Sequence, residues 1–151
     1  MSTIALSASL SHLAVGLADG TVLIYRHLDQ SISPSGGLTA LPKPRIIVES
    51  SSEPITGLGF REATDTDESP HLYLFIVTTN RVLTYQASGR GSGGSPTVVD
   101  EIGAGLGCAV VDWKAQNIVI ARDKAIYVCN VDGRGPSVAY EGMLFATHLD
   151  Q

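Results

Sequence analysis

The stretch LAVGLADGTVLIY, from Leu13 to Tyr25, decides the fold class of this chain. It contains two short apolar runs of β-branched and aliphatic residues, which is the composition of buried β-strands. Between the runs lies Ala18-Asp19-Gly20, in which Asp tolerates left-handed backbone angles and Gly adopts them without steric cost. The stretch therefore predicts a β-hairpin with a tight turn.

The same pattern occurs twice more along the chain. LFIVTTNRVLTY (Leu74–Tyr85) and IVIARDKAIYVC (Ile118–Cys129) both read as an apolar strand, a polar turn and a second apolar strand. Their predicted turns are Asn80-Arg81 and Asp123-Lys124. The hairpin is therefore a repeated unit.

Each hairpin forms the centre of a group of four predicted strands. The sequence has almost no helical periodicity, which indicates an all-β protein. Segments before the second and third hairpins, TGLGF and AVVDW, alternate and end in an aromatic residue, as matching first strands would. The predicted strands are Thr3–Ser7, Leu13–Leu17, Thr21–Arg26 and Arg45–Glu49; Ile55–Phe60, Leu72–Thr78, Arg81–Gln86 and Thr97–Ile102; and Gly107–Trp113, Asn117–Ala121, Ala125–Asn130 and Pro136–Tyr140.

Four-stranded units repeated about every 40 to 60 residues are typical of β-propeller blades. We predict an all-β fold, a partial WD40-like β-propeller of about three four-stranded antiparallel blades. We place it at residues 1–142, with blades at about 3–50, 55–102 and 107–142, and expect a divergent tail at 143–151. Segments rich in Ser, Pro, Gly or acidic residues predict loops at Asp29–Pro44, Arg61–Pro70 and Ser88–Pro96.

Three blades do not close a propeller, because closed rings have typically four to eight. We therefore expect a segment of a longer protein or a truncated gene product. Alone, such a piece exposes apolar sheet faces, so we expect marginal stability and self-association.

The composition narrows the possible functions. The chain has 151 residues and a net charge of −5, and its ten Lys and Arg residues are dispersed, which disfavours nucleic-acid binding. The N-terminus has no basic signal-peptide region, and the longest apolar run, Leu72–Val77, is too short to span a membrane, so we expect a cytoplasmic protein. Cys108 and Cys129 lack the spacing of a disulfide framework or a zinc site, and we expect buried free thiols.

Three patterns could carry chemistry, but each has a simpler interpretation. GRGSGG (89–94) matches a dinucleotide-binding motif formally, but a strand follows it where the motif requires a helix. The acidic side chains between Arg61 and Pro70 lack the spacing of an EF-hand loop, which favours a solvated loop; they are Glu62, Asp65, Asp67 and Glu68. The histidines are far apart, which favours surface or capping roles; they are His12, His27, His71 and His148.

No nucleophile elbow or other catalytic signature is present in the sequence. We therefore expect no catalytic, cofactor-binding or metal residues, no cofactor and no enzymatic activity. Trp113 and the third-strand tyrosines Tyr25, Tyr85 and Tyr127 are expected to pack in the blades.

One stretch points to a particular family. NIVIARDKAIYVCNVDGRGPSVAYEG (Asn117–Gly142) resembles the propeller of the vacuolar protein sorting-associated protein 11 family, above all in the turn Gly133-Arg134-Gly135-Pro136 and the residues after it. The resemblance covers residues 3–142 and is nearest to the fungal branch. Further similar stretches occur in the order that the family shows; they are LAVGLADGTVLIYR (13–26), EPITGLGFR (53–61), LFIVTTNRVLTY (74–85) and GAGLGCAVVDW (103–113).

The resemblance implies a scaffold without catalysis. Family members are core subunits of the HOPS and CORVET complexes, which tether endosomal and vacuolar (lysosomal) membranes before fusion. The implied partners are class C vacuolar sorting subunits and Rab GTPases, with peripheral location on late endosome and vacuole membranes through the complex. Loops such as Arg61–Pro70 would face partner proteins.

Two other classes of function stay open at this point. A generic WD40-like interaction module of another pathway shares the repeat, because a fold does not specify a function. An enzyme on a propeller scaffold would need polar groups that converge at the channel, and the sequence offers none.

Overall fold

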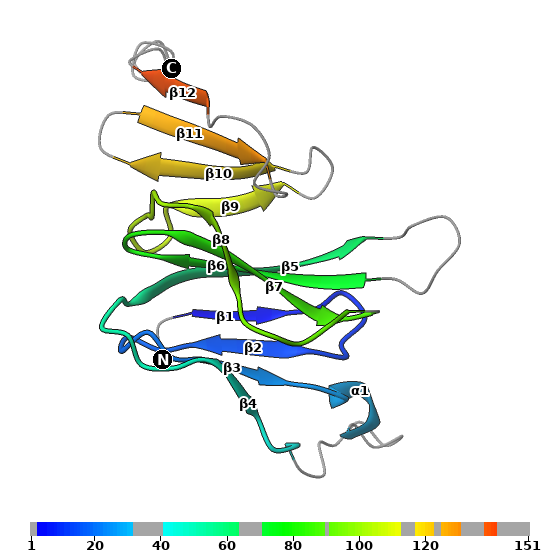
Figure 1. The fold of residues 1–151 in the computed structure, drawn as a ribbon. Coiled ribbons are helices and arrows are strands. Elements are labelled where there is room, and N and C mark those ends of the chain that lie inside the picture. Colours follow the sequence, from blue (N-terminus) through cyan, green and yellow to red (C-terminus); the bar gives the residue numbers. More distant parts are fainter. Residues whose placement is uncertain are drawn as a thin grey trace.

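The computed structural model describes residues 3–31, 41–63, 71–89, 91–112, 117–122, 125–130 and 138–141. Within these residues almost all regular structure is β, and it forms three four-stranded antiparallel sheets (Figure 1). This confirms the predicted fold class. The elements are β1 (Thr3–Leu6), β2 (Leu13–Gly16), β3 (Val22–Tyr25), α1 (Leu28–Ser31), β4 (Arg45–Val48), β5 (Ile55–Ala63), β6 (His71–Thr78), β7 (Val82–Ser88), β8 (Thr97–Asp100), β9 (Ala109–Asp112), β10 (Asn117–Arg122), β11 (Ala125–Asn130) and β12 (Val138–Glu141).

Strand order within each sheet follows the chain, as in a propeller blade. The sheets are β1-β2-β3-β4, β5-β6-β7-β8 and β9-β10-β11-β12, and we call them the first, second and third blade. The first strand of each blade contacts the first strand of the next, β1 with β5 and β5 with β9. Figure 1 shows the three sheets stacked in chain order. The described residues thus form an open stack of blades.

The core consists of two interfaces between blades. Between the first and second blades lie Ile24, Ile55, Leu74 and Ile76, each at most 1% exposed. Between the second and third lie Phe75, Val82 and Ile118, each at most 2% exposed. Side chains of a strand alternate between its two faces, so β6, in the middle blade, must be apolar on both. This explains its continuous apolar run.

The first hairpin turn has the predicted geometry. Gly20 adopts a φ of 92°, its N–H donates to the Leu17 carbonyl over 3.1 Å, and the Thr21 N–H donates to Asp19 Oδ1 over 2.9 Å. In the second turn Asn80 does not adopt a left-handed angle. There the Thr78 hydroxyl oxygen accepts from the Asn80 and Arg81 N–H groups over 3.1 and 3.0 Å, which stabilises the turn instead. The third turn, Asp123-Lys124, lies outside the described residues.

Three expectations need correction. The predicted acidic loop does not begin at Arg61, because β5 continues to Ala63 and pairs Glu62 with Leu72 of β6. The predicted loop 29–44 begins inside the short helix α1. Cys108 is not buried but exposed, because the chain turns through Gly105–Cys108 just before β9.

Other expectations fall outside the described residues, including Trp113, the turn Gly133–Pro136 and the tail 143–151. Of the tyrosines, Tyr85 is buried and Tyr25 and Tyr127 are half-buried, in agreement with packing roles. Within the described part of the chain, no helix has both the length and the apolar character needed to cross a membrane.

Candidate interaction surfaces

One side of the molecule consists of the two segments that join the blades and of the hairpin turns beside them. We call it the linker side; it comprises residues 17–21, 49–54, 78–81 and 101–108. The Ser51 and Ser52 N–H groups donate to the Asp19 carbonyl over 3.1 and 3.2 Å, and the Ala104 N–H donates to the Thr78 carbonyl over 3.0 Å. Each linker is therefore tied to the hairpin turn of the blade that precedes it.

Glu53 adds a second connection on this side, between the first linker and the second blade. Its Oε2 accepts from Arg81 Nε over 3.0 Å and from the Thr78 hydroxyl over 3.1 Å. Desolvation raises the pKa of Glu53, but the hydrogen bonds from Arg81 and Thr78 outweigh it, so the pKa lies below its ordinary value. Glu53 is therefore ionised at neutral pH and orders the linker.

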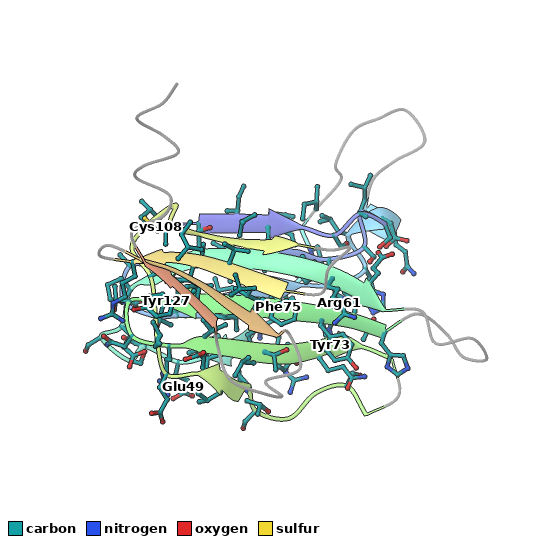
Figure 2. All side chains as sticks on the ribbon, turned by 90° about the horizontal axis from the view of Figure 1, so that it is seen from above. Glu49, Arg61, Tyr73, Phe75, Cys108 and Tyr127 are labelled. Carbon is teal, nitrogen blue, oxygen red and sulfur yellow. The ribbon has the colours of Figure 1, made fainter. Side chains whose placement is uncertain are left out.

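The linker side exposes acidic and apolar groups together. Asp19, Glu49 and Glu101 are exposed, Leu106 is 67% exposed, and Cys108 presents a free thiol. Figure 2 shows Glu49 and Cys108 at one end of the blades and Arg61 and Tyr73 at the other. This combination suits a protein partner with a basic, partly apolar surface. Sequence reasoning missed it, although the acidic residues Glu49 and Glu101, at the ends of two predicted strands, were an available signal.

A second candidate surface is the face of the first blade that points away from the second blade. We call it the outer face; it comprises Ile4, Leu6, Leu13, Val15, Leu23, Tyr25 and Ile46. Strand register places these residues side by side, for example Leu6 opposite Leu13 and Leu13 opposite Tyr25. Ile4 and Leu6 are 57% and 51% exposed. The described residues thus leave this apolar sheet face partly exposed.

The described histidines are not brought together as a site. His12 is 8% exposed. Its ring Nδ1 lies 2.7 Å from Ser11 Oγ, and its backbone N–H donates to Ser7 Oγ over 3.0 Å. The centroid of its ring lies 6.3 Å from that of Phe60. His71 Nδ1 lies 2.9 Å from Gln86 Nε2, and the ring stacks on Tyr73. Packing and hydrogen bonds to nearby side chains, in the turn before β2 for His12 and across β6 and β7 for His71, account for the positions of both rings.

His27 is exposed with a φ of 57°, and His148 lies outside the described residues. Among the residues that the structure places, no three His, Cys, Asp or Glu side chains gather in a way that could hold a metal ion. Of the acidic group expected between residues 61 and 70, only Glu62 is described.

The described residues of the glycine-rich motif, Gly89 and 91–94, lie in the loop between β7 and β8. The Ser92 N–H donates to the Gly89 carbonyl over 3.1 Å, and the Gly93 N–H donates to the Gln86 carbonyl over 3.2 Å. Gly89, Gly91, Gly93 and Gly94 have φ between 78° and 99°, so the glycines serve the path of the chain. The next element is the strand β8, which agrees with the predicted loop at Ser88–Pro96 and not with a dinucleotide-binding motif.

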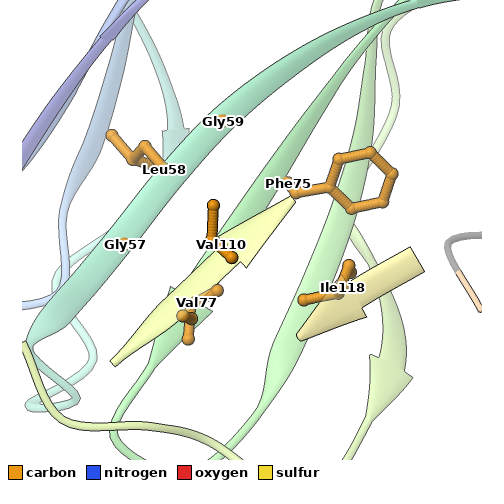
Figure 3. Close-up of a pocket in the computed structure, with 8 residues that line it drawn as sticks. Gly57, Leu58, Gly59, Phe75, Val77, Val110 and Ile118 are labelled. Carbon is orange, nitrogen blue, oxygen red and sulfur yellow. The ribbon is translucent and has the colours of Figure 1, made fainter. Parts of the chain in front are cut away.

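A pocket of about 170 Å³ lies between the second and third blades, beside β5 and β9 (Figure 3). Its walls are apolar, and they include Phe75, Val77 and Ile118; Gly57 and Gly59 expose backbone there. The pocket has no charged side chain to orient a substrate, and it is small for a ligand site. It is a packing gap beside the glycines of β5.

Comparison with known proteins gives this architecture a family. The family model described as PEP5/VPS11 N-terminal matches residues 1–147. The chain belongs to the PEP5/VPS11 N-terminal family. The resemblance stated from residues 3–142 is thereby confirmed.

Individual members show the extent of the match. The vacuolar protein sorting-associated protein 11 homolog of Dictyostelium discoideum is 36% identical over 138 residues, which is 89% of this chain and 13% of the relative. The homologs of Mus musculus and Homo sapiens are 30% identical over 152 residues, or 98% of this chain and 14% of each relative. The chain therefore spans about one seventh of these relatives. The fungal placement stays a prediction.

Proposed function

We propose that this chain is a non-catalytic scaffold segment of a vesicle-tethering subunit in transport from endosomes to the vacuole or lysosome. The match of residues 1–147 to the PEP5/VPS11 N-terminal family is the observation that carries the proposal. The relatives' names place them in vacuolar protein sorting. In this proposal the segment works within a HOPS- or CORVET-type complex, with class C vacuolar sorting subunits as its partners and Rab GTPases nearby. It reaches late endosome and vacuole membranes peripherally, through that complex.

The structure supports a binding role for the linker side. Its linkers are ordered by hydrogen bonds to Asp19 and Thr78 and by the Glu53–Arg81 ion pair, so little conformational entropy is lost when a partner binds. Its exposed carboxylates, Asp19, Glu49 and Glu101, would steer a basic partner. We therefore assign the partner contact to the linker side.

The test uses the natural full-length gene product, tagged in its own cells. We expect the other class C subunits to co-purify with it. The double substitution Glu49→Lys and Glu101→Lys should lower their recovery about tenfold, because two attractive charges become repulsive. The control replaces Asp29 and Glu62 with lysine; both are also exposed. Asp29 lies in α1 and Glu62 near the end of β5, at the opposite end of the blades from the linker side (Figure 1). This control should leave recovery unchanged.

Two results would contradict these assignments. If the tagged product is stable but brings down no class C subunit, the tethering role is wrong, and a WD40-like module of another pathway becomes the better description. If the subunits co-purify equally with both double variants, the tethering role stands but the linker side is not the contact.

A further inference from the structure

The linker between the second and third blades ends in a tight turn that presents a leucine to solvent. Leu106 is 67% exposed, more than any other large apolar side chain in the described part of the chain. It is the second residue of the turn Gly105–Cys108, which the Cys108 N–H closes by donating to the Gly105 carbonyl over 3.1 Å. Within this turn only the third residue, Gly107, has a positive φ, of 75°, which is the geometry of a type II turn. The backbone thus holds Leu106 at the apex.

Both ends of this turn are fixed to the blades. On one side, Ala104 is 3% exposed, and its N–H donates to the carbonyl of Thr78 in the second blade over 3.0 Å. On the other side, the N–H of Ala121 in the third blade donates to the Cys108 carbonyl over 2.8 Å. None of these contacts uses the side chain of Leu106. A partner therefore meets a leucine on an ordered backbone, and little conformational entropy is lost when it binds.

The charge of the linker side indicates what kind of surface fits around the leucine. Within the residues of the linker side, the single cation is Arg81, and it is paired with Glu53 over 3.0 Å. Asp19, Glu49 and Glu101 are exposed, and no second cation of the linker side balances them. The surface therefore combines one protruding apolar side chain with a negative charge. It is complementary to an apolar pocket that has Lys and Arg side chains around its rim.

We propose that Leu106 is the apolar anchor of the partner contact, and that it inserts into an apolar, basic-rimmed pocket on a protein partner. This inference rests on the proposed function, which assigns the contact to the linker side, and it names the side chain that holds the partner there. The two kinds of group then have different tasks. The carboxylates speed association by steering the basic partner, and the buried leucine slows dissociation.

The test measures binding kinetics between the purified natural full-length gene product and the class C subunit that co-purifies with it. Leu106→Ser should raise the dissociation rate about tenfold, because the burial of one leucine side chain is lost. The association rate should stay within about twofold, since no charge changes. Leu106→Met, which keeps an apolar side chain of similar volume, should restore slow dissociation.

Two comparison variants separate the leucine from the charges and from apolar exposure in general. The double variant Glu49→Lys and Glu101→Lys should mainly slow association, and its effect should shrink as the salt concentration rises from about 0.1 to 1 M. The effect of Leu106→Ser should persist over that range. The matched control is Leu10→Ser, because Leu10 is 47% exposed in the turn between β1 and β2, at the opposite end of the blades (Figure 1). It should change neither rate.

Cys108 provides a direct readout of the position of the contact. Its thiol is exposed, and its Sγ lies 3.7 Å from the carbonyl oxygen of Leu106. An alkylating reagent should modify Cys108 readily in the free full-length product and much more slowly in the complex, as measured by mass spectrometry of the peptide that contains it. Equal modification in both states would contradict the proposal, because a pocket that encloses Leu106 also covers a thiol two residues away.

The kinetic outcomes distinguish a failure of this inference from a failure of the proposed function. If no class C subunit binds the unmodified product, the proposed function is wrong and this inference falls with it. If a subunit binds but dissociates from the Leu106→Ser product as slowly as from the unmodified one, the proposed function stands and Leu106 is not the anchor. A Leu106→Ser product that melts at a clearly lower temperature would show that the leucine packs against another part of the same polypeptide, which also overturns the inference.

Discussion

His12 lies in the turn between β1 and β2, next to Ser11 and against the ring of Phe60. Burial is the main cause of its lowered pKa, and the positive charges of His27 and Arg26 lower the pKa further. The side chain is therefore neutral at pH 7 in the folded protein. The sequence predicted a surface or cap role for His12; the structure instead buries its side chain in the turn between β1 and β2.

A pH dependence follows from this environment. The unfolded chain binds a proton at His12 near pH 6.5, whereas the folded chain binds it only at lower pH. Because the unfolded state then holds more protons, the free energy of unfolding should fall as the pH drops below about 6.5, and stop falling below the folded-state pKa. His12→Gln should flatten this dependence in urea unfolding between pH 7.5 and 5.

His27→Gln is the comparison variant, because it removes one of the charges that lower the pKa of His12 but leaves the burial of His12 in place. It should therefore reduce the pH dependence without abolishing it. A wild-type curve that is flat over this range, or one that His27→Gln flattens as fully as His12→Gln does, would contradict the assignment to the burial of His12.

At the scale of elements, the strands follow from local pattern, whereas the linkers follow from packing. Strand bounds differ from the predicted ones by only a few residues, because β-branched and apolar alternation is a local property. The linker at 101–108 has no such signal. Gly103 lies so close to the second hairpin that a Cβ at this position would meet the backbone of Thr78 and Asn80.

This close approach predicts the effect of a single methyl group. Gly103→Ala should lower the free energy of unfolding by about 1–3 kcal/mol, because backbone cannot move aside as a flexible side chain can. Gly105→Ala, in the same linker, would place its Cβ 3.8 Å from Cys108 Sγ, an ordinary contact, and should change stability by less than about 0.5 kcal/mol. Chemical denaturation of both variants checks this, and equal losses would refute the packing argument.

At the scale of the whole molecule, stability depends on the two interfaces between blades. Phe75 is 2% exposed and lies between the second and third blades, beside Val82 and Ile118. Phe75→Ala should therefore cost about 3–5 kcal/mol, a large part of the total stability of a small domain. Ile46→Ala, at a position 57% exposed, should cost less than about 0.5 kcal/mol. A thermal melt that shows comparable losses for both would mean that the blades do not depend on each other.

The sequence by itself determined the strands, their grouping into three four-stranded units and the family, because hydrophobic alternation and turn residues are readable from neighbours along the chain. Only the tertiary structure decided which apolar faces are covered. Leu6 and Phe60 stand at the same place in the repeat, yet they are 51% and 3% exposed. The exposure of Cys108 and the ordering of the linker side were decided in the same way. The physical reason is that burial depends on the surface that packs against a residue, and residues distant in the sequence supply that surface.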